Sequence, residues 1–349
     1  MLDDLNVLTQ KDSEKTLDSS VMQPEQLSMD VTITHPVTEK RAVKNIVFVG
    51  MGGSALAPEF VQSWLGDDIK LPIEIVKTYT LPSYVNEDTL VFFASCSGNT
   101  EEVLEALDAS EATGAQRAII VGGGTLLERA NELGISHVQL PPIKIQPRML
   151  TFIQVRAILS LLDDFGVMSS EKYLAEMADT QEWLATTSAK WAKEVPTSEN
   201  YAKQIAELAV GKTPEFMGGF IFRFIAYKWK ISWNENAKNV AFWSYYPEFN
   251  HNEFIGWTSH PVEKPYAIFD LASTLEHPRI QKRFEVSNRL LSGHRPAPHT
   301  IELQGDSVLQ QLCWGHLLAD FASIYTGVLN GVDPGPVPLI TKLKQDLNS

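Results

Sequence analysis

Two hydrophobic patterns alternate between residues 45 and 145. The short runs IVFVGM, LVFFAS and AIIVGG are apolar throughout, which is typical of parallel strands that are buried on both faces. They predict strands over Asn45 to Met51, Thr89 to Ser95 and Arg117 to Gly122. A small-residue helix follows the first strand, and an amphipathic helix begins at about Thr100. This rhythm predicts successive βαβ units.

The middle of the chain, residues 148 to 210, contains no strand-like run. Apolar positions recur at spacings of three and four in RMLTFIQVRAILSLLDDFG and EKYLAEMADTQEWLATTSAKWAKE. Such spacing is typical of helices that bury one face. We interpret part of this region as a helical connector.

A second alternation of strands and helices follows the connector. Its expected elements cover Glu215 to Phe220, Phe222 to Trp233, Tyr266 to Asp270, a helix from about His277, Thr300 to Gln304, and Ser307 to Leu329. The chain is therefore predicted to be an α/β protein with two mostly parallel sheets flanked by helices in three layers. The expected parts are an N-terminal helical arm over 1–40, a first domain over 41–165, the connector over 166–210, and a second domain with a C-terminal helix over 211–349. We expect the halves to meet closely around a small-molecule site.

Composition narrows the classes of function. The 349 residues include 44% hydrophobic and 21% charged residues, which excludes a largely disordered chain. The formal net charge of -14 argues against a duplex-binding surface. An anionic ligand would have to be held locally, by hydroxyls and by backbone N–H groups at a helix start.

The two cysteines, Cys96 and Cys313, are far apart and show no C-x-x-C spacing. Neither a disulfide framework nor a zinc cluster is therefore expected. The N-terminal residues lack a basic stretch followed by an apolar segment, and no run of eighteen apolar residues occurs. We expect a cytoplasmic protein.

A first candidate loop, VFVGMGGSALAPEF, places Gly52, Gly53 and Ser54 between a predicted strand and a predicted helix. Glycines here allow a ligand to approach the backbone closely, although they also occur where a turn is merely tight. The loop fits the G-x-G-x-x-A form of the dinucleotide fingerprint. However, Glu74, the acid this fingerprint would use, lies inside an apolar run.

A second loop, TLVFFASCSGNTEEVLEAL, gathers Ser95, Ser97 and Thr100 where a buried strand ends and an amphipathic helix begins. Asn99 or Thr100 could cap this helix, and Glu102 fits a capping pattern. Capping would explain one of the three hydroxyls. The pattern therefore favours a phosphate-binding loop.

Titratable residues are concentrated in WNENAKNVAFWSYYPEFNHNEFIGW, which contains Glu235, Lys238, Glu248, His251 and Glu253. Carboxylates near apolar rings can have raised pKa values, and histidine titrates near neutrality, so both suit proton transfer. A metal site is less favoured because H-E-x-x-H is absent. A purely structural cluster remains an alternative. Both alternatives leave the two upstream loops unexplained.

Several motifs carry a family resemblance. GMGGSALAPE and SCSGNTEEV resemble the phosphate-binding loops of sugar isomerase (SIS) domains. NENAK and PEFNHNE resemble motifs of the bifunctional phosphoglucose/phosphomannose isomerases, as do MLDDL, QPRML and FASIYTGVLNGVDPGPVPLITKLKQDL. The resemblance covers nearly the whole chain apart from about 168–200. It implies two SIS domains.

The resemblance also implies roles for individual residues. The substrate phosphate would be bound by Gly52, Gly53, Ser54, Ser95, Ser97 and Thr100. Glu235 would move a proton between C1 and C2 through a cis-enediol, and His251, supplied by the partner subunit of a homodimer, would help open the sugar ring. Arg148 would stabilise the enediolate, and Lys344 would lie near the ring oxygen, with Lys342 as the competing placement.

The expected reaction interconverts glucose 6-phosphate, and also mannose 6-phosphate, with fructose 6-phosphate. It needs no cofactor or metal, because a carboxylate base and cationic stabilisation of the oxyanion suffice. One alternative is a regulator that binds sugar phosphate without catalysis. Another is an aminosugar-phosphate isomerase, which the absence of a cysteine near the N-terminus makes less favoured.

Overall fold

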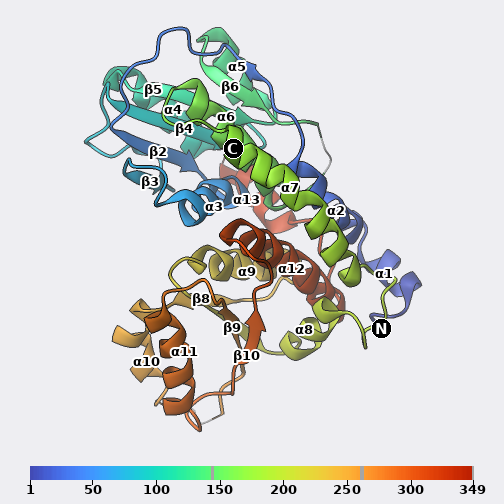
Figure 1. The fold of residues 1–349 in the computed structure, drawn as a ribbon. Coiled ribbons are helices and arrows are strands. Elements are labelled where there is room, and N and C mark those ends of the chain that lie inside the picture. Colours follow the sequence, from blue (N-terminus) through green and yellow to red (C-terminus); the bar gives the residue numbers. More distant parts are fainter. Residues whose placement is uncertain (143–144, 260–262, 348–349) are drawn as a thin grey trace. The chain divides into compact units, whose positions relative to one another are not determined.

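The computed structural model describes residues 1–142, 145–259 and 263–347 and divides into two compact units (Figure 1). Unit 1 comprises Met1–Met22 and Leu184–Ser349, and unit 2 comprises Gln23–Trp183. The first two helices, α1 (Leu5–Lys11) and α2 (Thr16–Met22), thus belong to the unit that contains the second half of the chain. The predicted domain limits at residues 40, 165 and 210 stay a prediction.

Unit 2 contains a six-stranded sheet in the order β1-β6-β5-β4-β2-β3. Its strands are β1 (Ile33–Thr34), β2 (Asn45–Gly50), β3 (Ile73–Val76), β4 (Thr89–Ser95), β5 (Gln116–Val121) and β6 (Ser136–Gln139). All pairs are parallel except β1 with β6. The three strands predicted from continuous apolar runs are confirmed, and every residue of β4 is buried. Strands β1, β3 and β6, which have two to four residues each, were not among the predicted strands.

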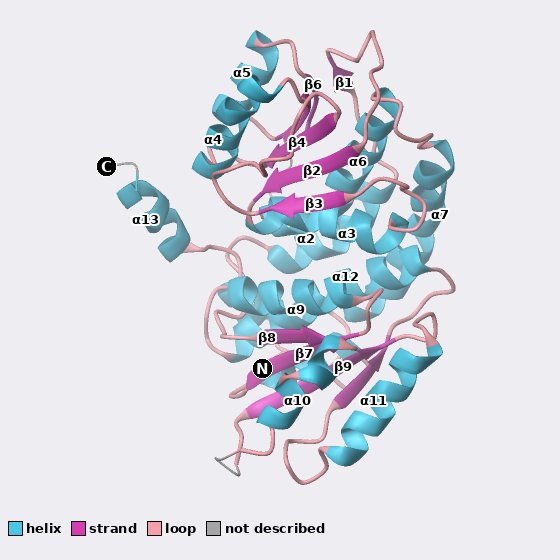
Figure 2. Cartoon of the chain, turned by 90° about the vertical axis from the view of Figure 1, so that its left-hand side faces the viewer, coloured by secondary structure: helices cyan, strands magenta, loops and turns pink. Residues whose placement is uncertain are grey.

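Helices cover both faces of this sheet (Figure 2). On one face, Val47, Val91 and Ile119 pack in a core cluster with residues of α4 and α5, such as Val103 and Leu126. On the other face lie α3 and α6, which pack on each other. The helical segments of unit 2 are η1 (Gln23–Leu27), η2 (Gly52–Ala55), α3 (Leu56–Leu65), α4 (Glu101–Ser110), η3 (Glu111–Thr113), α5 (Gly124–Glu132), η4 (Pro147–Met149) and α6 (Thr151–Asp164), and α7 (Glu171–Ser188) continues into unit 1.

Unit 1 contains a four-stranded, all-parallel sheet in the order β10-β9-β7-β8. Its strands are β7 (Thr213–Gly218), β8 (Phe242–Tyr245), β9 (Tyr266–Ala272) and β10 (His299–Glu302). The helical segments are η5 (Ala189–Trp191), α8 (Tyr201–Ala209), α9 (Arg223–Asn236), η6 (Glu248–His251), α10 (Glu253–Gly256), α11 (Pro278–Leu290), α12 (Val308–Leu329) and α13 (Pro338–Leu347). The predicted α/β fold with two mostly parallel sheets is confirmed. Strand β8 was not predicted; it is a four-residue edge strand that is only partly buried.

Helix α12 is the central helix of unit 1. Among the described residues it is the one helix long and apolar enough to cross a membrane, but 94% of its apolar window is buried inside the protein. Its apolarity therefore reflects a core position. Both neighbours α8 and α9 pack on it.

Candidate active site

The two predicted phosphate loops follow neighbouring strands of the unit 2 sheet. Strand β2 leads into η2, which contains Ser54, and β4 ends at Ser95. Because β2 and β4 are parallel neighbours, both loops leave the same edge of the sheet. The carboxyl ends of parallel strands are the usual ligand-binding edge of such sheets.

Four hydroxyl side chains gather at this edge, and we call Ser54, Ser95, Ser97 and Thr100 the hydroxyl cradle. The Ser95 hydroxyl is hydrogen-bonded to that of Thr100 (2.8 Å), lies 3.5 Å from that of Ser97, and accepts the Gly98 N–H (3.0 Å). Ser54 Oγ accepts the Cys96 N–H at 3.2 Å and so joins the first loop to the second. The structure therefore brings together the four hydroxyl residues that the sequence singled out.

Capping of α4 differs from the expectation. Thr100 is the N-cap residue by position, but its hydroxyl is bound to Ser95 and makes no capping bond. The Asn99 side chain instead accepts the Thr125 N–H (3.1 Å) at the start of α5. The prediction that Asn99 or Thr100 caps α4 is therefore wrong. The first turn of α4 has no side-chain cap, and such a helix end suits an anion.

Arg148 lies beside the first loop. It is 1% exposed, and its Nη1 donates to Gln146 Oε1 (3.2 Å) within the segment around η4. A Cβ on Gly53 would lie only 2.8 Å from the Arg148 backbone nitrogen, so glycine at this position permits the close approach. Gly52 has a left-handed φ of +52°, which also favours glycine. Unit 2 therefore holds Gly52, Gly53, the hydroxyl cradle and Arg148 in adjoining segments.

Glu235 lies in the last turn of α9 in unit 1. It lines a cavity of about 420 Å³ together with Asn234, Lys238, Asn239, Val240, Val337, Pro338, Leu339 and Ile340. Lys238 has a left-handed backbone (φ +49°), and its Nζ donates to the carbonyls of Glu235 (2.8 Å) and Pro334 (3.1 Å). Helix α13 carries both Lys342 and Lys344, and neither is among the residues that line the cavity. The choice between them stays a prediction.

A row of buried polar contacts fixes α9 against α12. Lys228 Nζ lies 2.8 Å from Asp320 Oδ1, both side chains being 0% exposed, and Ser232 Oγ donates to the same oxygen (3.0 Å). One turn further on, Asn236 Nδ2 donates to Ser323 Oγ (2.8 Å). These contacts set how far α9 is rotated, and Glu235 precedes Asn236. Polar groups in a core can specify such a register.

His251 ends the one-turn helix η6 and is exposed. It is not among the residues that line the Glu235 cavity. The expectation that a partner subunit supplies this histidine stays a prediction.

A group of buried ionisable residues in unit 1 was not predicted from the sequence. Glu215 lies inside β7 at 3% exposure, Asp270 lies inside β9 at 1%, and Arg295 is 7% exposed. Burial and the neighbouring Glu253 carboxyl raise the pKa of Glu215 to about 10, and burial raises that of Asp270 to about 6. The available signal was a single acidic residue inside each of the apolar runs TPEFMG and YAIFDLA.

We expect Glu215→Gln to stabilise the protein increasingly as pH rises. The folded pKa of Glu215 lies above the unfolded value, so the folded state binds more protons and wild-type stability falls between about pH 4.5 and 10. The amide does not titrate, and its advantage should grow by up to about 1.4 kcal/mol per pH unit. Urea denaturation at pH 5.5 and 7.5, with the exposed Glu207→Gln as control, measures this. If the difference in unfolding free energy between Glu215→Gln and wild type were the same at both pH values, the raised pKa of Glu215 would be contradicted.

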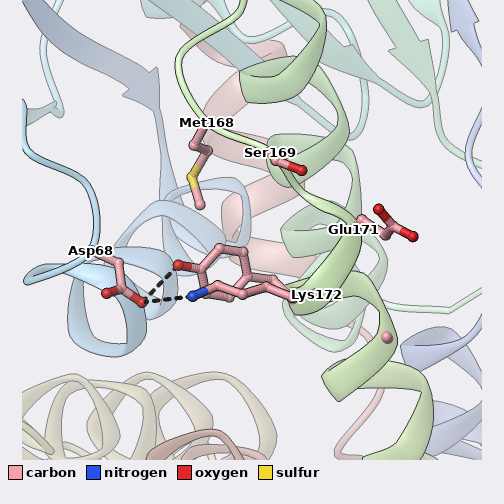
Figure 3. A pocket seen from close by; sticks show the side chains of 7 residues that line it. Asp68, Met168, Ser169, Glu171 and Lys172 are labelled. Atoms are coloured by element: carbon pink, nitrogen blue, oxygen red, sulfur yellow. Dashed lines mark hydrogen bonds and ion pairs between the residues drawn. The ribbon is translucent and has the colours of Figure 1, made fainter.

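Two further features bear on the chemistry that the chain can support. Among the residues the structure describes, no group of three or more His, Cys, Asp or Glu side chains is placed to hold a metal ion. A cavity of about 580 Å³ in unit 2 is lined by Asp68, Met168, Ser169, Glu171, Lys172, Tyr173 and Ala175 (Figure 3). Three of its polar side chains interact, since Tyr173 Oη donates to Asp68 (2.7 Å) and Lys172 Nζ lies 3.9 Å away from the same carboxylate. None of the predicted site residues lines it.

Comparison with known proteins agrees with this architecture. Residues 198–347 match the family of the bacterial phospho-glucose isomerase C-terminal SIS domain. The chain is 32% identical over 305 residues to the bifunctional phosphoglucose/phosphomannose isomerase of Aquifex aeolicus, covering 87% of this chain and 90% of that protein. The corresponding protein of Caldicellulosiruptor bescii is 31% identical over 307 residues, with the same coverage.

The solved structures share the fold at lower sequence identity. The C-terminal domain of glucosamine-fructose-6-phosphate aminotransferase from Francisella tularensis matches with a TM-score of 0.70 at 15% identity, over 92% of this chain and 98% of that one. Together with the match of residues 198–347 to a SIS domain, this likeness confirms the predicted SIS fold. Identity above 30% over most of both proteins shows more: the chain belongs to the bifunctional phosphoglucose/phosphomannose isomerase family and is an isomerase of this type.

Proposed function

We propose that the protein interconverts glucose 6-phosphate and mannose 6-phosphate with fructose 6-phosphate through a cis-enediol intermediate. Family membership supports the reaction class. The observation that carries the assignment is the hydroxyl cradle, which lies beside Arg148 at the ligand-binding edge of the unit 2 sheet. Such a cradle suits a phosphate monoester, because its hydroxyl groups lie together within hydrogen-bond range of one small anion.

The cradle would hold the phosphate without a strongly basic surface. The chain carries a formal net charge of -14, so attraction over long distances does not favour an anion. Hydroxyl groups and the uncapped N–H groups at the start of α4 act at hydrogen-bond range instead. The ester end of the sugar would thus be fixed and its carbonyl end left for chemistry.

Glu235 would act as the base at the carbonyl end. A proton α to a carbonyl is weakly acidic, so a positioned carboxylate must act together with cationic stabilisation of the developing oxyanion. Arg148 would supply that stabilisation, and Lys344 would approach the ring oxygen. His251 of a second subunit would open the ring, making a cytoplasmic homodimer the active form.

A coupled assay with fructose 6-phosphate tests the reaction directly. Purified protein should produce glucose 6-phosphate and mannose 6-phosphate, and solvent deuterium should enter at C1 or C2. If the protein binds the sugar phosphate but shows neither turnover nor exchange, it is a ligand-binding regulator and the proposed reaction is wrong.

Ser95→Ala should weaken phosphate binding selectively. The change removes the hydroxyl that bonds Thr100 and accepts the Gly98 N–H, so the KM for fructose 6-phosphate should rise about tenfold. Ser110→Ala is a matched control, since Ser110 is a buried serine of the following helix whose hydroxyl donates to Leu107 O (2.6 Å). Each variant should lose about 1 kcal/mol of stability, whereas the control should keep its KM. Equal KM values for the two variants would refute a phosphate role for Ser95.

A further inference from the structure

We infer that Asn250 is the positioning residue of His251, fixing the direction in which the imidazole is presented to the substrate. This inference rests on the proposed function of His251 in ring opening. It concerns the residue immediately before His251 and the face of α11 to which that residue is bound. Neither Asn250 nor any residue of α11 was among the site residues predicted from the sequence.

Three successive residues of the short helix η6, Phe249, Asn250 and His251, differ in their surroundings. Phe249 is 0% exposed and packs edge-on against the rings of Tyr246 (5.3 Å) and Phe254 (5.9 Å). Asn250 is half-buried, and His251 is exposed. Phe249 therefore anchors the segment in the core, Asn250 contacts α11, and His251 is exposed to solvent.

Both ends of the Asn250 amide are held by α11. Its Nδ2 donates to Ser287 Oγ (2.8 Å), and its Oδ1 accepts from Arg283 Nη1 (2.9 Å). Positions 283 and 287 are one turn apart on the same helical face, and Ser287 is 2% exposed. A donor and an acceptor used together fix both the location and the orientation of the amide plane, which packing of Phe249 alone would not do.

Arg295 also contacts the segment that contains His251. Its guanidinium carbon lies 5.6 Å from the ring centre of Phe249 and 5.5 Å from that of Trp257, on either side of His251 in sequence. Its Nη2 donates to Asn288 Oδ1 (2.9 Å), and Asn288 Nδ2 donates to Asp270 Oδ2 (2.6 Å) in β9. The His251 segment is thus tied to α11 and to the sheet.

The hydrogen bonds between Asn250 and α11 matter because proton transfer requires a well-oriented imidazole. An exposed imidazole on a single helical turn can adopt many orientations, and a displacement of about 1 Å can cost about a hundredfold in rate. Fixing the backbone immediately before His251 limits this freedom. Asn250 would therefore affect the rate through His251 and would not contact the substrate.

A double-mutant cycle tests this role. Asn250→Ala should lower kcat about tenfold with little change in KM, and should lower it no further in a His251→Ala background. Asn250→Asp keeps an acceptor for Arg283 and should recover part of the rate. The inference is overturned if Asn250→Ala matches wild type, if its effect is the same in both backgrounds, or if His251→Ala leaves kcat unchanged.

A measurement independent of turnover separates this inference from the proposed function. The imidazole Cε1–H resonance of His251, assigned with His251→Ala, should shift and sharpen in Asn250→Ala as the ring gains mobility. The control Asn131→Ala removes a surface amide of α5, which donates to Leu127 O (3.0 Å), and should leave the resonance in place. An unchanged His251 resonance in Asn250→Ala would overturn positioning. Absence of wild-type turnover would instead overturn the proposed function.

Discussion

Glu235→Gln is expected to lower kcat for fructose 6-phosphate at least ~100-fold while the affinity for the substrate is kept. Glutamine has nearly the same shape as glutamate, so it should occupy the same place at the end of α9 beside the cavity of about 420 Å³. An amide cannot accept the proton that must move between C1 and C2. The loss should therefore fall on the chemical step and leave binding intact.

Two measurements separate binding from chemistry in this variant. Calorimetric titration with 5-phosphoarabinonate should give the same affinity as wild type, while solvent deuterium exchange at C1 and C2 should fall with kcat. Glu182→Gln, which changes an exposed glutamate of α7, is the control and should keep both. Exchange that persists at the wild-type rate in Glu235→Gln would show that another group is the base.

Asp320→Asn should destabilise the protein by about 3–5 kcal/mol, the usual cost of breaking a buried ion pair on one side. Lys228 and Asp320 are 2.8 Å apart at 0% exposure, so the variant leaves the Lys228 ammonium buried beside a neutral amide. Asp320 also accepts the Ser232 hydroxyl at 3.0 Å. Breaking this contact should loosen the register of α9 on α12, and with it the placement of Glu235.

Urea denaturation followed by tryptophan fluorescence measures this effect, since Trp229 and Trp233 are fully buried in α9. The matched variant replaces the whole pair with apolar residues, Lys228→Met together with Asp320→Leu. It should be more stable than Asp320→Asn, because no charge is then left buried. If both variants lost the same stability, packing volume and not the buried charge would explain the result.

The hydrophobic pattern by itself predicted the two-sheet α/β fold. Strands β2, β4 and β5 are buried on both faces, so each appears as a continuous apolar run that local composition reveals. The edge strand β8 has only four residues and is partly exposed, so its short aromatic run did not distinguish it as a strand. The hydrophobic pattern of a segment reflects how the segment is buried. Its value for predicting a strand is therefore lowest where the strand is only partly buried.

The candidate residues were also visible in sequence, but their partners were not. The glycine and serine loops were found because a strand-to-helix turn leaves a local signature. That the Asn99 side chain accepts the Thr125 N–H at the start of α5 depends on how β4 and β5 lie side by side. Hydrogen bonds between segments follow from pairing in space, which spacing along the chain does not encode.

Local sequence patterns thus predicted the longer buried elements, the two mostly parallel sheets and the residue types available for chemistry, because these depend on neighbours within a few positions. Three other contacts are visible only in the folded protein: Gly53 lies against Arg148, Lys228 pairs with Asp320 across two helices, and α11 binds Asn250. Each of these contacts joins residues at least thirty positions apart, so it exists only once packing has brought their helices and loops together.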